Sequence, residues 1–455
     1  MRQNRSEVFL EVARSLCPVC GRLVDADVLV RDNRVFFRKF CPDHGHSEAL
    51  VSSDLEHYRF SLMFNKPGAV PAGFHSRTAR GCPHDCGLCP EHQQHTCLAL
   101  VEITNACDLE CPVCFAAAGA APVRHVPLAT VREMLSRYRT AEGSPEVVQF
   151  SGGEPTLHPE LFAVITAARD MGIGIVQLNT NGLRIARDPD FVERLAELKP
   201  SVYLQFDGFR PATYELIRGR DLAADKMKAV DRLASHGFTI VLAVTVVEGV
   251  NDGEIGEITR FAIEHPRIRG VIFQPAACTG RYLPPFTPTQ RITLPDVLRA
   301  VEEQTGGLLT RRDFIPVPCP FPTCFSVTYV YNSDDGVTTL PRLINVDDYL
   351  DYFKNRIITN LDPLTQAALE NLWSAGATPG SDRTLKDFAC CCGVAPEVLK
   401  ELEEAITMVG VHALMDRHSF DLKRAKKCCI HQLLPDGRIV PFCVYNNLER
   451  GRSDG

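Results

Sequence analysis

The sequence contains no apolar run of the roughly 18–20 residues that would cross a bilayer. Charged side chains interrupt its beginning, so no apolar region typical of a signal peptide is present. Basic residues are not in excess, because 49 Lys and Arg stand against 56 Asp and Glu, a formal charge of −7. That balance argues against nucleic-acid binding through bulk positive charge. We therefore expect a cytoplasmic protein with no nucleic-acid partner.

Cysteine, by contrast, is abundant: the 455 residues include 19 cysteines, which gather toward the two ends of the chain. Between Cys114 and Cys319 only Cys278 occurs. A long chain without a secretory signal is a poor candidate for a disulfide framework. Cysteines scattered through an ordinary core would also not cluster in this way. Metal ligation is therefore the favoured interpretation.

The middle of the chain alternates short apolar runs with helical patterns. Six runs are expected to form strands, at residues 98–103, 147–150, 173–178, 202–206, 240–247 and 270–274. Strands separated by helices pair in parallel through right-handed crossovers. The expected fold class is α/β, a six-stranded βα partial barrel, with an open doubly wound sheet as the alternative. In either fold, ligands gather at the carboxyl ends of the strands.

Four segments are expected along the chain. Residues 1–75 form a metal-binding module built on a hairpin that turns at Asp32-Asn33, and residues 76–97 form a cysteine-rich loop. Residues 98–300 form the partial barrel. Residues 301–455 form a C-terminal cluster domain, with a helix expected over residues 396–415 and a closing hairpin that turns at residues 435–437.

A cysteine triad directly follows the first barrel strand, with the spacing Cys107-x-x-x-Cys111-x-x-Cys114. Three thiolates on one loop can hold three irons of a cubane cluster and leave the fourth iron open to a ligand. A structural zinc, or a cluster that takes a fourth cysteine from elsewhere, is the alternative. The second strand then runs into Gly152-Gly153-Glu154. Two glycines allow the backbone to approach a ligand closely, and the carboxylate can accept a hydrogen bond from an amine.

Three further groups of candidate metal ligands lie outside the barrel. The first repeats the triad spacing and predicts an auxiliary iron–sulfur cluster, with structural zinc as its alternative: Cys82, Cys86, Cys89 and Cys97. The second flanks the N-terminal hairpin and suits zinc or a mononuclear iron: Cys17, Cys20, Cys41 and His44. The third predicts a second auxiliary cluster: Cys319, Cys324, Cys443 and one of Cys428 and Cys429, for which we take Cys429.

Two expectations accompany these groups. Adjacent cysteines rarely bind the same metal, because neighbouring side chains point apart on a strand or a helix. The same caution applies to the run 390–392. The histidines beside the second triad are expected to be solvated loop residues rather than ligands: His84, His92 and His95.

The segments CDLECPVC and SGGEPT together resemble the core of radical S-adenosylmethionine (SAM) enzymes. The resemblance implies that Cys107, Cys111 and Cys114 bind a catalytic [4Fe–4S] cluster. It places SAM on the open iron, with Gly152, Gly153 and Glu154 near its amino group. Further strand ends of that core would face SAM or substrate through Asn179, Gln205, Asp207 and Thr245.

The terminal cysteine motifs resemble one group within that superfamily. It contains the archaeal tetraether lipid synthase and the hydroxymethyl-dihydropterin methyltransferases, the class D radical SAM methylases. The resemblance implies hydrogen abstraction from an unactivated sp³ carbon and carbon–carbon bond formation between lipid chains. Radical methylation of a pterin or another small molecule is the alternative, and a non-catalytic iron–sulfur electron carrier is a third.

The same resemblance implies a set of cofactors and partners. The cofactors are SAM, the catalytic cluster, two auxiliary [4Fe–4S] clusters and one mononuclear iron or zinc, with iron favoured. The partners are a lipid or small-molecule substrate, an electron donor such as ferredoxin or flavodoxin, and a peripheral contact with the membrane. A lipid chain requires a long apolar tunnel, whereas a pterin requires a short pocket with paired polar groups. No concentration of amide side chains beyond the SAM-facing loops is evident in the sequence.

Overall fold

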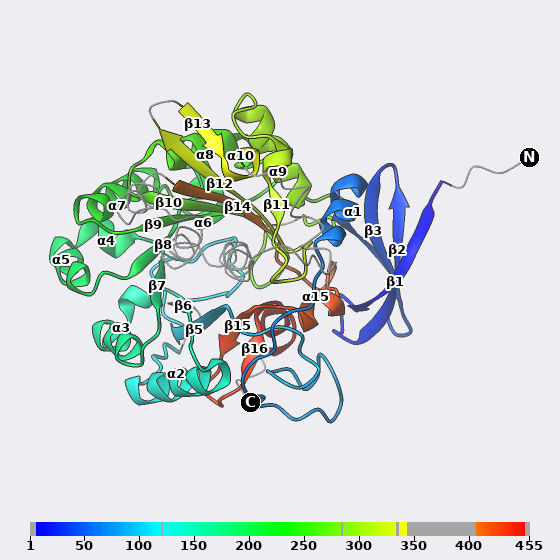
Figure 1. Cartoon of the computed structure of the whole chain (residues 1–455), viewed down its shortest axis with the longest axis horizontal. Helices are drawn as coiled ribbons and strands as arrows, with labels where there is room; N and C mark the ends of the chain where they lie inside the picture. Colours follow the sequence, from blue (N-terminus) through cyan, green and yellow to red (C-terminus); the bar gives the residue numbers. More distant parts are fainter. Residues whose placement is uncertain (1–5, 120–121, 284, 334–335, 344–405, 451–455) are drawn as a thin grey trace, which may run out of the picture.

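The computed structural model describes residues 6–119, 122–283, 285–333, 336–343 and 406–450. These residues form two sheets, one of four strands and one of twelve. Figure 1 shows the small sheet standing at one side of the larger one, at the N-terminal end of the chain. Among the described residues, no helix has both the length and the apolar character needed to cross a membrane.

The N-terminal sheet is an antiparallel meander in chain order. Its elements are β1 (Val8–Leu16), β2 (Leu23–Arg31), β3 (Arg34–Cys41), β4 (Gly45–Ser52) and the following helix α1 (Leu55–Met63). The expected hairpin is confirmed, because β2 and β3 are joined by Asp32 and Asn33, whose φ angles are 49° and 58°. Two residues with positive φ make the turn that matches strand twist, and Asp and Asn tolerate that conformation.

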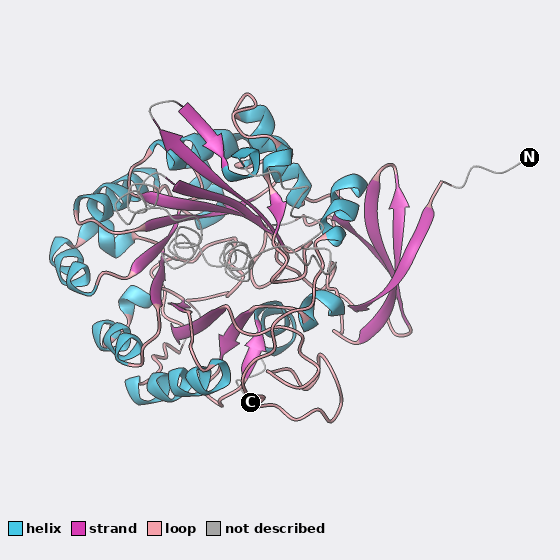
Figure 2. Ribbon diagram, viewed as in Figure 1, coloured by secondary structure: helices cyan, strands magenta, loops and turns pink. Residues whose placement is uncertain are grey.

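The expected parallel series is also confirmed, and its strands run close to the predicted ranges. In order along the chain they are β5 (Leu98–Thr104), β6 (Val147–Gly152), β7 (Ile175–Thr180), β8 (Ser201–Gln205), β9 (Ile240–Val246) and β10 (Ile268–Pro275). Each pairs in parallel with its sequence neighbour. Figure 2 shows these strands on the inside, with helices covering their outer side. Because every crossover carries its helix on the outer side, the inner side is left for a ligand.

The covering helices follow their strands in the usual alternation. They are α2 (Leu128–Glu142), α3 (Leu161–Asp170), α4 (Leu183–Arg187), α5 (Pro189–Leu198), α6 (Pro211–Arg218), α7 (Ala223–Ser235), α8 (Ile255–Glu264) and α9 (Leu294–Gln304). Two short 3-10 turns, η1 (Pro155–Leu157) and η2 (Asp252–Glu254), lie between them, and a third, η3 (Arg311–Asp313), follows α9. Their buried aliphatic and aromatic side chains form one continuous core with the strands.

The C-terminal part of the chain extends the same sheet at both edges. Strand β14 (Ile406–His412) pairs in parallel with β10, and β15 (Ile430–Leu433) pairs in parallel with β5. Antiparallel strands then continue the sheet on either side: β11 (Ile315–Pro316), β12 (Phe325–Ser333), β13 (Gly336–Thr339) and β16 (Ile439–Pro441). The parallel series therefore has eight strands rather than six, and the two added ones come from the segment expected to hold cysteine clusters.

The C-terminal helix prediction is wrong where the structure describes it. Residues 406–412 form β14 instead of the second half of a helix, while residues 396–405 lie outside the described part, as does the run 390–392. Five successive residues of β14 are buried, since the strand is sandwiched between β10 and β12. A fully buried strand shows no alternation that sequence periodicity can recognise.

The hairpin expected near residues 435–437 is confirmed. Residues 434–438 connect β15 to β16, and the short elements α15 (Leu422–Lys426), α16 (Phe442–Val444) and η4 (Tyr445–Glu449) flank it. Figure 1 shows these C-terminal elements beside β5 and the loop that precedes it. Two segments far apart in the sequence, both rich in cysteine, are thereby brought together.

Candidate active site

The loop that carries the cysteine triad begins where β5 ends. Backbone hydrogen bonds tie it to the end of β6: the Gly153 N–H donates to the Thr104 carbonyl and the Glu154 N–H to the Ala106 carbonyl, both at 2.7 Å. A Cβ on Gly152 would lie 2.1 Å from the Thr104 carbonyl oxygen, and one on Gly153 would lie 2.1 Å from that of Ala106. Both positions therefore require glycine. The backbone that approaches them closely is the triad loop itself, which the sequence could not reveal.

All three cysteines of the triad line one cavity of about 250 Å³. Cys111 is buried, whereas Cys107 and Cys114 are half-buried. Burial raises the pKa of the Cys107 thiol to about 12 and also raises the pKa of Cys111. Thiols held in such surroundings are poor thiolates on their own, but a metal deprotonates the thiols that coordinate it. Three soft donors on one loop at a cavity wall fit an iron–sulfur cluster with one open iron.

Glu154 is buried, with 1% of its surface exposed, and its carboxylate is occupied by the protein. It accepts hydrogen bonds from the Thr156 N–H (3.0 Å) and hydroxyl (2.6 Å), the Thr180 hydroxyl (2.8 Å) and the Asn181 N–H (2.7 Å). Asn181 in turn donates to Asp108 on the triad loop at 2.6 Å. Glu154 also lines the cavity. Its first role in this structure is to join the ends of β6 and β7 to the triad loop.

Asp207 and Arg218 form a buried ion pair behind the triad. The Arg218 guanidinium donates to both carboxylate oxygens of Asp207, at 2.7 and 2.8 Å, and to the Val113 carbonyl at 3.0 Å. It also contacts the Cys111 thiol. Arg218 lines the cavity, whereas Asp207 is fully buried and is not among the lining residues. Asp207, expected to face SAM or substrate, instead holds the arginine that does face the cavity.

A buried lysine supports the same region and carried no recognisable signal in the sequence. Lys226 on α7 donates to the Gln205 side-chain oxygen at 2.8 Å and to the Asn181 carbonyl at 2.5 Å. Burial lowers the pKa of Lys226 to about 8. Gln205, Asn179 and Thr245 all line the cavity, as expected of strand ends. Arg218 had a signal, because it follows the strand-end segment QFDG, but the pattern assigned it no role.

Amide side chains converge on the cavity from several strands. They come from β6, β7, β8 and β10: Gln149, Gln177, Asn179, Gln205 and Gln274. Gln149 donates to Gln177, and Gln274 donates to the Tyr203 hydroxyl at 3.0 Å. The sequence did not suggest this concentration, because each amide is separated from the next by a βα unit or by one residue that faces the opposite side. The apolar part of the wall includes Leu98, Ile272 and Phe325.

A second group of cysteines also lines the cavity. Cys324, Cys428 and Cys443 all line it. The Arg424 side chain donates to the Cys324 sulfur at 3.1 Å. The three thiols interact electrostatically with one another, which places them in one neighbourhood. The cavity thus has a cysteine group on the triad side and another from the C-terminal segment.

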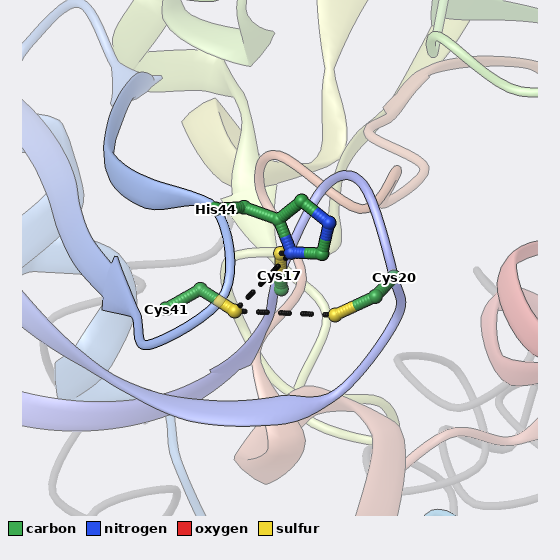
Figure 3. Close-up of side chains that lie close together, drawn as sticks. All are labelled: Cys17, Cys20, Cys41 and His44. Carbon is green, nitrogen blue, oxygen red and sulfur yellow. Dashed lines mark hydrogen bonds between the residues drawn. The ribbon is translucent and has the colours of Figure 1, made fainter.

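The four N-terminal ligand candidates come together as one site. Figure 3 shows the side chains of Cys17, Cys20, Cys41 and His44 directed toward a common point. Their ligand atoms all lie within 4.8 Å of one another. The Cys41 sulfur is 3.9 Å from that of Cys20 and 3.5 Å from His44 Nδ1. A tetrahedral S₃N set of this size suits zinc or a mononuclear iron.

The structure does not keep together the four cysteines that were expected to hold the first auxiliary cluster. Cys82 and Cys86 are in contact, and Cys89 lies close to Cys86. Cys97, however, lies 2.9 Å from Cys319, sulfur to sulfur.

The C-terminal quartet is likewise split. Cys429 joins Cys97 and Cys319, while Cys428 lies with Cys324 and Cys443. The expectation that adjacent cysteines point apart holds here, but both side chains of the pair reach a cysteine group.

Comparison with known proteins identifies the family. The radical SAM superfamily matches residues 101–262, and the HMPTM N-terminal zinc ribbon domain matches residues 9–53. The chain is 35% identical over 473 residues to the 7,8-dihydro-6-hydroxymethylpterin dimethyltransferase of Methanocaldococcus jannaschii. The aligned region covers 96% of this chain and 93% of that protein. The protein belongs to the radical SAM superfamily, in the family of that dimethyltransferase.

Two further similarities cover only part of the chain. A GTP 3′,8-cyclase of Alkaliphilus metalliredigens is 29% identical over 170 residues, which is 36% of this chain and 52% of that protein. Among solved structures, Streptococcus suis SuiB bound to its precursor peptide SuiA has 19% identity and a TM-score of 0.40, over 47% of this chain and 46% of that one.

Membership of the superfamily settles the enzyme class. The protein is a radical SAM enzyme, which uses a [4Fe–4S] cluster and SAM. Its N-terminal module is a zinc ribbon by family, and its four converging ligand atoms agree with a metal-binding role.

Proposed function

We propose that this radical SAM enzyme is a methyltransferase that acts on a reduced pterin or a closely similar bicyclic substrate. This is the alternative of the sequence analysis rather than its main expectation, because no comparison supports the coupling of lipid chains. The relative that matches nearly the whole chain is named for dimethylation of 7,8-dihydro-6-hydroxymethylpterin.

The amide-lined cavity is the observation that carries the proposal. A pterin presents a row of hydrogen-bond donors and acceptors along one edge, and burying such an edge without partners is costly. Amide side chains provide both a donor and an acceptor. Gln149, Gln177 and Gln274 stand on three different strands and face one cavity. These amides already hydrogen-bond within the wall, Gln149 to Gln177 and Gln274 to Tyr203, and such a polar wall suits the polar edge of a pterin better than an alkyl chain.

The chain's own residues position the reaction. Cys107, Cys111 and Cys114 would hold the catalytic cluster, which with SAM supplies a radical able to remove hydrogen from an unactivated carbon. Arg218 fixes the loop through the Val113 carbonyl and places a positive charge against Cys111. The amides orient the substrate edge. The apolar part of the cavity wall, with Leu98, Ile272 and Phe325, would exclude water from the space around the substrate.

The cysteine group Cys324, Cys428 and Cys443 would hold an auxiliary centre at the wall of the same cavity. Arg424 adds a buried positive charge there. A nearby cation lowers the free-energy cost of burying negatively charged thiolates. Cys82, Cys86 and Cys89 would hold another centre. An electron donor such as ferredoxin or flavodoxin would supply the electron that the radical chemistry consumes.

The proposal is tested with the full chain, reconstituted anaerobically and supplied with SAM, a reductant, a folate-type one-carbon donor and 7,8-dihydro-6-hydroxymethylpterin. We expect 5′-deoxyadenosine and methylated pterin to form together, as measured by mass spectrometry. Gln274→Met should raise KM for the pterin about ten-fold, because one polar group of the substrate loses its partner.

Gln290→Met is the matched control, since Gln290 is exposed and does not line the cavity. Equal effects of the two substitutions would contradict the assignment of the amides. The pterin proposal would be contradicted if 5′-deoxyadenosine formed without any methylated pterin while an alkyl lipid gave a product. That outcome would favour the coupling of lipid chains.

A further inference from the structure

A compact group of ligand atoms lies apart from the triad and from the zinc ribbon. The ligand atoms of His95, Cys97 and Cys319 all lie within 4.8 Å of one another. The Cys97 sulfur is 2.9 Å from the Cys319 sulfur and 3.5 Å from His95 Nε2. The Cys429 thiol contacts both of the other thiols. Three ligand atoms therefore converge, and a fourth potential ligand, Cys429, contacts two of them, so that three distant segments meet here.

The thiols are buried among mostly apolar side chains, and the Gln94 amide donates a hydrogen bond to the Cys319 sulfur at 3.3 Å. Cys97, Cys319 and Cys429 are 2%, 2% and 0% exposed. Phe64, Tyr203 and other hydrophobic side chains pack around them. All three cysteines are free, and a disulfide between two of them would need sulfur atoms about 2.05 Å apart and would leave the third without a partner. Three thiols converging in such a place are typical of thiolate ligation to a metal.

His95 is oriented as metal-binding histidines are. Its Nδ1 lies 3.3 Å from a carboxylate oxygen of Glu142. Glu142 is itself fixed, because it accepts a hydrogen bond from the Thr96 N–H at 2.8 Å and its side chain is only 5% exposed. A carboxylate that accepts a hydrogen bond from Nδ1–H leaves the lone pair on Nε2, the atom that faces the sulfur of Cys97. The expectation that this histidine is a solvated loop residue is therefore wrong.

The neighbouring histidines differ from His95. His92 is 6% exposed, and its Nε2 lies 3.0 Å from Nε2 of His431 and 2.9 Å from the Cys428 carbonyl. It supports the backbone at Cys428, so the expectation that His92 is solvated is wrong. His84 is exposed, as predicted.

We propose that His95, Cys97, Cys319 and Cys429 bind one metal centre with three thiolates and one imidazole. The centre is separate from the one at Cys82, Cys86 and Cys89. The ligand set suits an iron–sulfur cluster or a single zinc or iron ion, which share an affinity for thiolate and imidazole. Because Cys429 belongs to this centre and Cys428 to the group with Cys324 and Cys443, the two adjacent residues link the two groups of cysteines.

The first experiment counts metal in the full chain, reconstituted anaerobically with iron and sulfide, with zinc measured in the same samples. Cys97→Ser and Cys82→Ser should each remove one centre, and the double variant should lose the sum of both. A double variant that loses no more metal than either single variant would overturn the proposal, because Cys97 would then serve the Cys82 centre.

The second experiment identifies the nitrogen ligand. His95→Cys should retain the metal but lose its nitrogen ligand. For a reduced cluster, the nitrogen hyperfine coupling in pulsed EPR should disappear. For zinc, the nitrogen scatterer in X-ray absorption at the zinc edge should be replaced by sulfur. Spectra are recorded without SAM and in a His44→Cys background, so that no other imidazole ligand contributes. The control His84→Ala should leave the spectra unchanged. A nitrogen signal unaffected by His95→Cys would overturn the assignment, and neither readout depends on pterin methylation.

Discussion

Arg218 joins Asp207 to Cys111: its guanidinium donates two hydrogen bonds to the buried carboxylate and contacts the thiol. One side chain therefore connects the end of β8 to the triad loop. Its third contact, with the Val113 carbonyl, lies between two cysteines of the triad. The arrangement makes the geometry of the loop depend on an ion pair that lies behind it.

We expect Arg218→Met to reduce the free energy of unfolding by about 3–5 kcal/mol, because it leaves Asp207 buried and charged without the cation that pairs with it. The double variant Asp207→Asn with Arg218→Met should cost less than the sum of the two single variants. Urea unfolding at matched metal content measures both. Arg187→Met is the control, since Arg187 pairs with Asp225 at the surface and its side chain is 54% exposed. Additive costs would contradict a direct coupling of the pair.

Gly153→Ala should prevent the triad loop from closing on β6, because the new Cβ would lie 2.1 Å from the Ala106 carbonyl oxygen. The expected result is loss of the catalytic cluster, measured as iron per chain and as loss of 5′-deoxyadenosine formation. Gly253→Ala is the matched control, since no atom lies within 4 Å of a Cβ built there. Full iron binding by Gly153→Ala would show that the loop can shift without losing its ligands.

Alanine at Cys107, Cys111 or Cys114 should each abolish reductive cleavage of SAM while leaving the fold intact. The barrel core is built from other residues, so circular dichroism should be unchanged. Continued formation of 5′-deoxyadenosine by the triple variant would move the catalytic cluster to Cys82, Cys86 and Cys89.

The protein should lose stability below about pH 6.5, in part through His57 on α1. Burial lowers the pKa of His57 to about 4, and its buried Nε2 has no hydrogen-bond partner. The unfolded chain binds a proton near pH 6.5 and the folded chain does not, so stability falls as the pH decreases between these two values. At pH 5.5 the loss is about 1 kcal/mol relative to pH 7.5.

His57→Gln should remove that part of the pH dependence. Unfolding of both proteins at pH 7.5 and 5.5 provides the comparison. An identical loss in the variant would assign the acid sensitivity to other groups.

The parallel barrel, the N-terminal hairpin and the closing hairpin could all be predicted from the sequence. Each depends on local signals: alternation, turn residues and the spacing of βα units. The superfamily resemblance was equally accessible, because Cys107, Cys111 and Cys114 lie within eight residues and the Gly152-Gly153-Glu154 segment lies on the next strand. Strand β14 was missed, since its burial on both sides removes the periodicity that distinguishes a strand from a helix.

What the sequence determined by itself is chemistry held within short segments: a cysteine triad on one loop and a four-ligand knuckle around one hairpin. Only the tertiary structure decided which cysteines meet across the chain. Pairing of β15 with β5 brings Cys429 to Cys97, and the opposite direction of the adjacent side chain carries Cys428 to Cys324 and Cys443. Spacing along a chain cannot reveal such groupings, because long-range partners are set by strand order and by which face each residue occupies. The same reason hid the amides of the cavity, which come together only when their strands are aligned in one sheet.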